Sequence, residues 1–277
     1  MASFVEDAGL TPDEVARYHR DGQVTPQWRL PADAIARMQR ALERLLAART
    51  DVRPDFIALP HVAAEQPTVP EVAREFFEFA TQPALLALVE PLIGPDIILW
   101  ASAVFCKPAS IGLEVPWHQD GQYWPIRPRA TVTVWIAFDL VTRENGCMQF
   151  IPGSHRMGDF SHDLSEREDL VLSNVVNDPR LDLSTARAIE LEPGQCSLHD
   201  VNLVHSSQPN RSGRRRAGYA IRYMPSTSHY DRTLKMGNAS SLAPIEFSAR
   251  PIWLLRGTDR CGQNDFTIGH TRGRCHG

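Results

Sequence analysis

The chain has 277 residues, of which 43% are hydrophobic and 22% are charged. This length and composition allow a full globular core, and we expect a single domain spanning residues 1–277. The formal net charge of −4 at pH 7 argues against nucleic acid or an anionic membrane surface as a partner.

The cysteines and the N-terminus both indicate an intracellular protein. Five cysteines are scattered without a CxxC pair, which favours a reducing cytoplasm over a disulfide framework or a zinc knuckle. The opening MASFVEDAGLTPDEV lacks the basic-then-apolar pattern of a secretion signal, and no apolar run is long enough to cross a bilayer. We therefore expect a cytoplasmic location.

The first third of the chain is typical of helices. Thr11 followed by Pro-Asp-Glu predicts an N-cap with proline at the first helical position, and this helix ends near Arg20. Residues 31–50 carry one apolar stripe at three- and four-residue steps, typical of a helix packed on a sheet. Residues 70–92 predict two more helices, broken by Pro83.

After the helical support of residues 1–94, residues 95–256 change to short apolar or alternating runs separated by glycine and proline. In chain order the runs are IILWASAVFCK, ATVTVWIAFDL, CMQFI, RAIELE, CSLHDVNLVHSS and AGYAIRYMP. Without helices between them, such runs favour an antiparallel sandwich or barrel. Within them, the polar segment 156–186 is too long for a turn and indicates a lid-like insertion. The tail 257–277 has no apolar period and is expected to be loosely ordered.

Trp117-His-Gln-Asp120-Gly is the most informative short motif. On an extended strand, residues two apart point to the same side, so His118 and Asp120 can offer an imidazole and a carboxylate to one metal ion. An oxygen-activating iron(II) site needs two imidazoles and one carboxylate on one face, with the opposite face open. An isolated HxD triplet is also common at exposed strand ends, so a second histidine must come from elsewhere.

The segment from Leu198 to Tyr219 supplies that histidine and a cation. One strand ends at His205, a polar turn follows, and the return strand begins with arginine, so a hairpin would bring Arg216 beside a metal bound by His205. A guanidinium there can form a bidentate pair with the distal carboxylate of 2-oxoglutarate. Arg214 and Arg215 are alternatives if the turn has a different length.

Three fragments together resemble the phytanoyl-CoA dioxygenase family of iron(II)/2-oxoglutarate oxygenases. They are WHQDGQYWP, VWIAFDLVTRENGCMQFIPGSH and HSSQPNRSGRRRAGYAIRYMP, which occur in the family's order between Trp100 and Pro225. The N-terminal LTPDEVARYHRDGQV is similar to the opening helix and strand of that family. The resemblance implies a double-stranded β-helix, or jelly roll, in which helices brace one sheet.

The resemblance also implies roles for individual residues. It implies His118, Asp120 and His205 as the metal ligands and catalytic centre, with Fe(II) and 2-oxoglutarate as cofactors. Arg216 and Ser207 match the residues that hold 2-oxoglutarate, and Trp135 matches a residue that lines its pocket. Halogenating relatives carry a small residue in place of the carboxylate, so Asp120 argues against halogenation.

Several other residues have competing interpretations. Six residues separate His199 from His205 on one expected strand, about 20 Å of rise, which favours a structural or pocket-wall role for His199. His155 is expected in a turn after a strand. The residues directly after the HxD motif are candidates to bind substrate, although aromatic side chains there serve equally well in packing: Gln122, Tyr123, Trp124 and Arg127.

These patterns predict a dioxygenase that uses O2 to hydroxylate a small organic molecule, with release of succinate and carbon dioxide. Desaturation, cyclisation and epoxidation begin from the same chemistry, and family analogy favours a secondary-metabolite intermediate as substrate. The alternative is a jelly-roll metalloprotein that uses a divalent ion for non-oxidative chemistry or for binding only. Arg216 with Ser207 distinguishes the two, because a metal-only site needs no carboxylate clamp.

Overall fold

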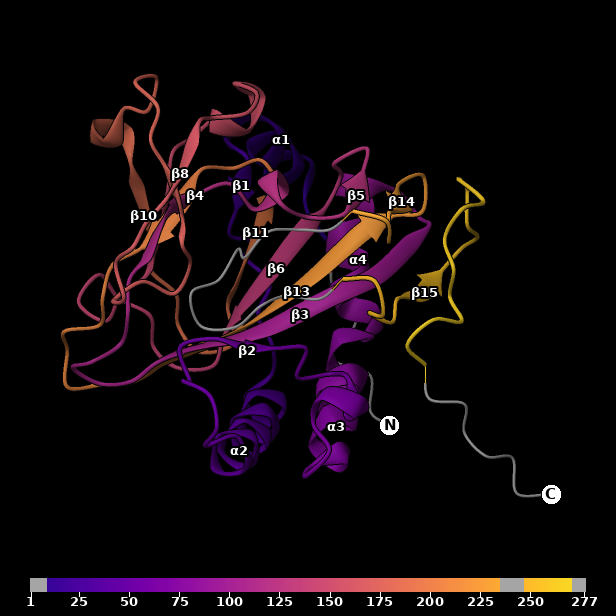
Figure 1. The fold of residues 1–277 in the computed structure, drawn as a ribbon, viewed down its shortest axis with the longest axis horizontal. Helices are drawn as coiled ribbons and strands as arrows, with labels where there is room; N and C mark the ends of the chain where they lie inside the picture. Colours follow the sequence, from indigo (N-terminus) through magenta and orange to yellow (C-terminus); the bar gives the residue numbers. More distant parts are fainter. Residues whose placement is uncertain (1–8, 235–246, 271–277) are drawn as a thin grey trace.

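The computed structural model describes residues 9–234 and 247–270. The helices of these residues lie mainly on one side of a large twisted sheet, and a smaller sheet lies beside it (Figure 1). The α-helices are α1 (Pro12–Asp21), α2 (Ala32–Ala48), α3 (Pro70–Ala80) and α4 (Pro83–Ile93). Short 3-10 turns are η1 (Ala63–Glu65), η2 (Asp120–Gln122), η3 (Ser154–Arg156) and η4 (Leu183–Thr185).

Local signals set where the helices begin. Thr11 caps α1 in a full capping box, in which its hydroxyl accepts from the Glu14 amide and the Glu14 carboxylate accepts from the Thr11 amide at 2.8 Å. Pro70 and Pro83 occupy the first turns of α3 and α4, where a missing N–H costs nothing. The predicted helices are confirmed, and Pro83 opens the second of the pair as well as ending the first.

The larger sheet is antiparallel throughout. Its order is β1 (Gln23–Val24), β11 (Cys196–Asp200), β6 (Val132–Ala137), β13 (Arg216–Pro225), β3 (Ile97–Lys107) and β15 (Trp253–Arg256), and β2 (Ile57–Ala58) also pairs with β3. The two long central strands, β3 and β13, pair along their whole length with one irregularity between Arg222 and Tyr223. Such a bulge bends the strand and re-aims neighbouring side chains.

The smaller sheet is antiparallel as well. Its order is β10 (Arg187–Ile189), β7 (Met148–Phe150), β12 (His205–Ser207) and β4 (Val115–His118). Two separate two-stranded sheets pair β14 (His229–Tyr230) with β5 (Ile126–Arg127) and β8 (His162–Leu164) with β9 (Asn174–Val176). Two antiparallel sheets braced by helices confirm the jelly-roll class that the sequence predicts.

Strand β13 shows how side-chain alternation separates the core from the cavity between the sheets. Tyr219 and Tyr223 face the helices, where the Tyr219 ring lies 5.0 Å from that of Phe76 and the Tyr223 hydroxyl donates to the Ala80 carbonyl at 2.6 Å. Ile221 belongs to the same core, whereas Ala220 and Arg222, which alternate with these residues, line the cavity on the opposite face. The helix side of the sheet therefore holds the largest apolar core, and the other face remains available for a site.

Two expectations about the strands and the tail are wrong. CSLHDVNLVHSS is not one strand: β11 ends at Asp200, and after a turn the chain continues as β12 in the other sheet. The tail is not loose through His270, because Arg260 binds Asp96 at 2.7 Å and the Cys261 amide donates to the Ser226 carbonyl. Residues 271–277 lie outside the described part.

The insertion 156–186 has structure that the sequence did not predict, since it holds the β8–β9 hairpin and η4. No single helix in the described segments is long and apolar enough to cross a membrane. The bent pair of α3 and α4, at 51° to each other, meets that test by length and composition only.

Candidate metal centre and cavity

The three predicted metal ligands come from two paired strands and the turn that follows one of them. His118 is the last residue of β4, Asp120 opens η2, and His205 is the first residue of β12. Because β4 and β12 are antiparallel neighbours, His118 and His205 lie directly opposite each other. The register of this one strand pair thus places both imidazoles at the same point.

The ligand atoms of His118, Asp120 and His205 all lie within 4.8 Å of one another. The three residues are only 3%, 5% and 8% exposed, and the two rings are 4.2 Å apart between centroids. One carboxylate and two imidazoles converging in a buried place match the facial arrangement that suits iron(II). The structure therefore brings together the three residues that the sequence singled out.

Backbone carbonyls orient both rings. Nδ1 of His118 lies 2.8 Å from the Pro116 carbonyl, and Nδ1 of His205 lies 2.9 Å from the Leu203 carbonyl. A carbonyl oxygen only accepts, so each Nδ1 carries the proton and each Nε2 is left to bind a metal. Burial lowers the pKa of His205 well below its usual value, which keeps this imidazole neutral. The donor set fits a divalent metal.

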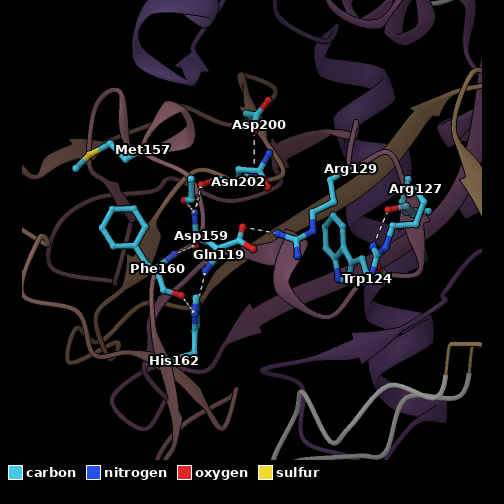
Figure 2. A network of polar contacts seen from close by, with 12 residues as sticks. Gln119, Trp124, Arg127, Arg129, Met157, Asp159, Phe160, His162, Asp200 and Asn202 are labelled. Carbon is cyan, nitrogen blue, oxygen red and sulfur yellow. Dashed lines mark hydrogen bonds and ion pairs between the residues drawn. The ribbon is translucent and has the colours of Figure 1, made fainter.

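Gln119, between two of these residues, ties their loop to the insertion (Figure 2). Its side-chain amide donates to the carbonyls of Asn202 and Gly158 at 2.7 and 3.2 Å and accepts from the Phe160 amide at 2.9 Å. Its own backbone N–H donates to Nε2 of His162 at 3.2 Å. The loop between His118 and Asp120 is therefore held from both sides.

Arg216 begins β13 as a buried cation beside the metal cluster. Its guanidinium donates to the Ser207 hydroxyl at 3.2 Å and to the Gly146 carbonyl from Nε at 3.1 Å, and it lies 5.3 Å from the centre of the Trp135 ring. Burial lowers its pKa to about 10, so it still carries its charge at neutral pH. Within the described part of the chain, this arginine has no carboxylate ion-pair partner.

The positions of Arg214 and Arg215 show that neither replaces Arg216 in the cavity. Arg215 points the other way and forms ion pairs with Asp139 at 2.9 Å and with Glu43 on α2. Arg214 lies in the turn, where its carbonyl accepts from Asn210 at 2.7 Å. Only Arg216 of these three lines the cavity.

A cavity of about 930 Å³, including the space open to solvent, contains the metal cluster. His118, Asp120, His205, Arg216, Ser207 and Trp135 all line it. Of the residues predicted to bind substrate, Tyr123 and Trp124 line the cavity and are buried. Gln122 and Arg127 are not in its lining, and the Arg127 guanidinium donates instead to the Trp124 and Ile126 carbonyls.

His199 lies much closer to the metal cluster than the sequence suggested. Its ring centroid is 4.9 Å from that of His205, and its Nε2 is 3.9 Å from an Asp120 carboxylate oxygen. The expected separation of about 20 Å is wrong because the chain turns between β11 and β12. The pocket-wall role is confirmed. His155 lies as expected in a turn after a strand, namely η3 after β7, where its Nε2 contacts the His19 carbonyl at 3.2 Å.

Sequence reasoning missed two arginines in the cavity wall, Arg222 and Arg250. Arg222 lies six residues after Arg216 on the same strand, so the alternation that places Arg216 also places Arg222 on the cavity face. That signal was present in the sequence. Arg250 precedes β15 in a segment without regular periodicity, and no comparable pattern marks it.

The sheets and the buried cluster between them define the class of jelly-roll proteins with a non-haem metal geometry. The phytanoyl-CoA dioxygenase (PhyH) family model matches residues 18–218, and the chain belongs to this family. Iron(II) and 2-oxoglutarate are the cofactors of the family's enzymes, and the donor set described above fits them.

Individual relatives agree with this assignment. Peroxisomal phytanoyl-CoA dioxygenase of Bos taurus is 30% identical over 162 residues, which cover 57% of this chain and 48% of the relative. The non-heme monooxygenase ThoJ superposes with a TM-score of 0.67 at 26% identity, covering 89% of this chain and 85% of ThoJ. The match thus spans about half the length of the first curated relatives.

The epimerase SnoN, solved with Fe3+, alpha ketoglutarate and nogalamycin RO, is a further structural neighbour. Its TM-score is 0.65 at 24% identity, and the superposition covers 88% of this chain and 98% of SnoN. At this identity the likeness concerns the fold alone.

Proposed function

We propose that this protein is an iron(II)- and 2-oxoglutarate-dependent dioxygenase that hydroxylates a small organic molecule. One observation carries the proposal: a buried His-Asp-His cluster lines the same cavity as a buried arginine that pairs with no carboxylate of the described residues. A metal-only site would have no use for the second feature, because burying an unpaired charge is costly. The arrangement therefore favours the oxygenase over the metal-only alternative.

In this proposal His118, Asp120 and His205 hold the iron, and Arg216 with Ser207 binds the distal carboxylate of 2-oxoglutarate. When bound, iron and co-substrate supply the oxidising power from O2 as 2-oxoglutarate is converted to succinate and carbon dioxide. The Trp135 ring packs against the Arg216 guanidinium and excludes water from that end of the cavity. The protein's own contribution is orientation and shelter of the reacting groups.

The proposal also covers the cellular location and the substrate class. Four cysteines are free thiols in the structure, which supports a reducing cytoplasm as the place of reaction. A secondary-metabolite intermediate is the proposed substrate class, and the fold shared with SnoN, an enzyme from nogalamycin biosynthesis, is compatible with it. We also propose that residues 1–277 act as one domain, in which the β8–β9 insertion lies close to the loop between His118 and Asp120.

The experiment is an anaerobic titration. Addition of Fe(II) and 2-oxoglutarate to metal-free protein should give the weak visible charge-transfer band of the chelated keto acid. His118→Ala should lose this band. Arg216→Ala should weaken 2-oxoglutarate binding about 100-fold, because it removes a charge-assisted, fork-like contact.

Arg215→Ala is the matched control, since Arg215 is adjacent in sequence but pairs with Asp139 outside the cavity. This variant should bind 2-oxoglutarate as wild type does. Tight metal binding without any band in the wild-type protein would contradict the oxygenase assignment and support metal-only chemistry. Unchanged affinity in Arg216→Ala would contradict the assignment of the clamp alone.

A further inference from the structure

Arg222 and Arg250 line the cavity beyond the metal cluster and stack on a pair of touching tryptophans. The Arg222 guanidinium carbon lies 5.0 Å from the centre of the Trp124 ring, and that of Arg250 lies 5.9 Å from the Trp100 ring. The two indoles are themselves 4.6 Å apart. Adjacent aromatic faces thus bring two cations to one place in the cavity.

Within the described residues, neither guanidinium has an ion-pair or hydrogen-bond partner. Arg250 is only 8% exposed, and the Nε atoms of both arginines are buried without a hydrogen-bond partner. Among residues 9–234 and 247–270, no carboxylate forms an ion pair with either guanidinium. The main opposing charge that acts on Arg222 is that of Asp120, whose oxygens face the metal site.

Another stacked arginine of this chain shows what a structural role looks like. Arg232 lies 4.9 Å from the centre of the Tyr230 ring, much as Arg222 lies over Trp124. Yet Arg232 donates hydrogen bonds to the carbonyls of Ser248, Arg250 and Asp265. Arg222 and Arg250 have no such acceptors in the described part of the chain, and both line the cavity. Two neighbouring cations with buried Nε atoms and no described carboxylate partner would be stabilised by an anion between them.

The co-substrate cannot serve as that anion while it is bound at Arg216. Arg216 and Arg222 share one face of β13 but stand six residues apart, a rise of about 20 Å. A five-carbon diacid spans roughly 5 Å from end to end. The metal cluster borders the same cavity, so the far arginines are left for a second molecule.

We propose that Arg222 and Arg250 form a substrate-binding anion site, so that the molecule oxidised here carries a carboxylate or another oxyanion beside an apolar body. The apolar part contacts the aromatic wall formed by Trp100, Tyr123, Trp124 and Phe247. Two guanidiniums present several N–H donors in fork geometry, which suits the paired oxygens of a carboxylate or phosphonate. Calling the occupant a substrate rests on the proposed dioxygenase function, whereas the anion site itself does not.

The test uses three probes that share one phenyl body: benzoate, phenylphosphonate and benzamide. Binding is measured by calorimetry on anaerobic protein loaded with Fe(II) and saturating 2-oxoglutarate, so that Arg216 is occupied. At least one of the two acids should bind about tenfold or more tightly than the neutral amide, because charge-assisted hydrogen bonds replace neutral ones. Which acid binds better identifies the oxyanion. Equal affinity of acids and amide would overturn the proposal.

Variants then locate the site. Arg222→Met and Arg250→Met keep a long side chain without charge, and each should reduce the preference for acid over amide to within about threefold while the 2-oxoglutarate band persists. Arg187→Met, at an exposed position on β10, is the matched control and should keep the preference. A preference that survives both cavity substitutions would show that the anion binds elsewhere and would overturn the assignment.

A second measurement needs no substitution. Phenylglyoxal modifies accessible arginines, and mass spectrometry of the wild-type protein should show that the better-binding acid protects Arg222 and Arg250 whereas benzamide does not. Equal modification with either probe contradicts the proposal. If the 2-oxoglutarate band never forms, the proposed function fails, but the probes can still be compared on metal-free protein because neither arginine is a metal ligand.

Discussion

At the scale of single residues, Gln119 matters because its buried amide supports the loop that carries two proposed metal ligands (Figure 2). Gln119→Leu keeps the volume but removes its three side-chain hydrogen bonds. We expect Fe(II) to bind 10–100-fold more weakly, because outer partners fix ligand orientation. Competition with a chromogenic chelator measures this affinity.

Gln122→Leu provides the control for that experiment. It makes the same chemical change three residues further along, at a side chain outside the cavity lining, and should leave iron affinity unchanged. Wild-type affinity in Gln119→Leu would mean that β4 and η2 position the ligands without help from the insertion.

Much of the site was predictable because side chains alternate along a strand and because a short polar turn predicts a return strand. His118 and Asp120 follow from a two-residue step, and Arg216 follows from a return strand after His205. His199 was misplaced because the turn between β11 and β12 was read as continuous strand. Asp200 and Asn202 held the missing signal, since the Asp200 carboxylate accepts from the Asn202 amide at 2.8 Å, a local turn bond typical of these residues.

At the scale of elements, strand β13 depends on one glycine. A Cβ at Gly218 would lie 2.1 Å from the Trp135 ring of β6, so Trp135 keeps its place only because this position has no side chain. Gly218→Ala should displace the indole from the Arg216 guanidinium. We expect 2-oxoglutarate affinity to fall about tenfold through loss of that cation–π contact and its water exclusion, as measured by the charge-transfer titration.

Gly213→Ala is the control for that prediction. It makes the same change in the turn that leads into β13, where a new Cβ meets nothing within 4 Å. Its 2-oxoglutarate affinity should equal that of the wild-type protein. A Gly218→Ala variant with unaltered affinity would show that the position of Trp135 is not needed for co-substrate binding.

The long elements were predictable and the short ones were not. The run IILWASAVFCK coincides with β3, and the two proline-led helices were expected where α3 and α4 lie. Their length and strong periodicity allow such segments to be predicted from the sequence. β8 and β9 have three residues each in a polar insertion, so their pairing depends on neighbouring segments rather than on local pattern.

At the scale of the whole molecule, acid stability should depend on His61. Its Nδ1 lies 2.6 Å from the Ser102 hydroxyl, and burial lowers its pKa from 6.5 to about 3. His61 therefore takes up a proton below about pH 6.5 in the unfolded chain, but only below about pH 3 in the folded protein. Stability is fully present above pH 6.5 and is lost as the pH falls between these values.

Urea unfolding at pH 7 and pH 5 tests this contribution. His61 should account for about 2 kcal/mol of the stability lost between the two conditions. His61→Gln should lower stability at both values but show a smaller difference between them by that amount. His229→Gln, at a half-buried position on β14, should retain the wild-type difference. An identical pH dependence in His61→Gln would contradict the assignment.

The pairing of β4 with β12 gives the metal a mechanical consequence. His118 and His205 are far apart in the chain, yet they face each other across the smaller sheet. An ion held by both would act as a cross-link that closes a long loop and fastens the end of that sheet. The larger sheet is stabilised instead by the apolar core that it forms with the helices. Metal binding would therefore stabilise the smaller sheet more than the larger one, because both histidine ligands belong to strands of the smaller sheet.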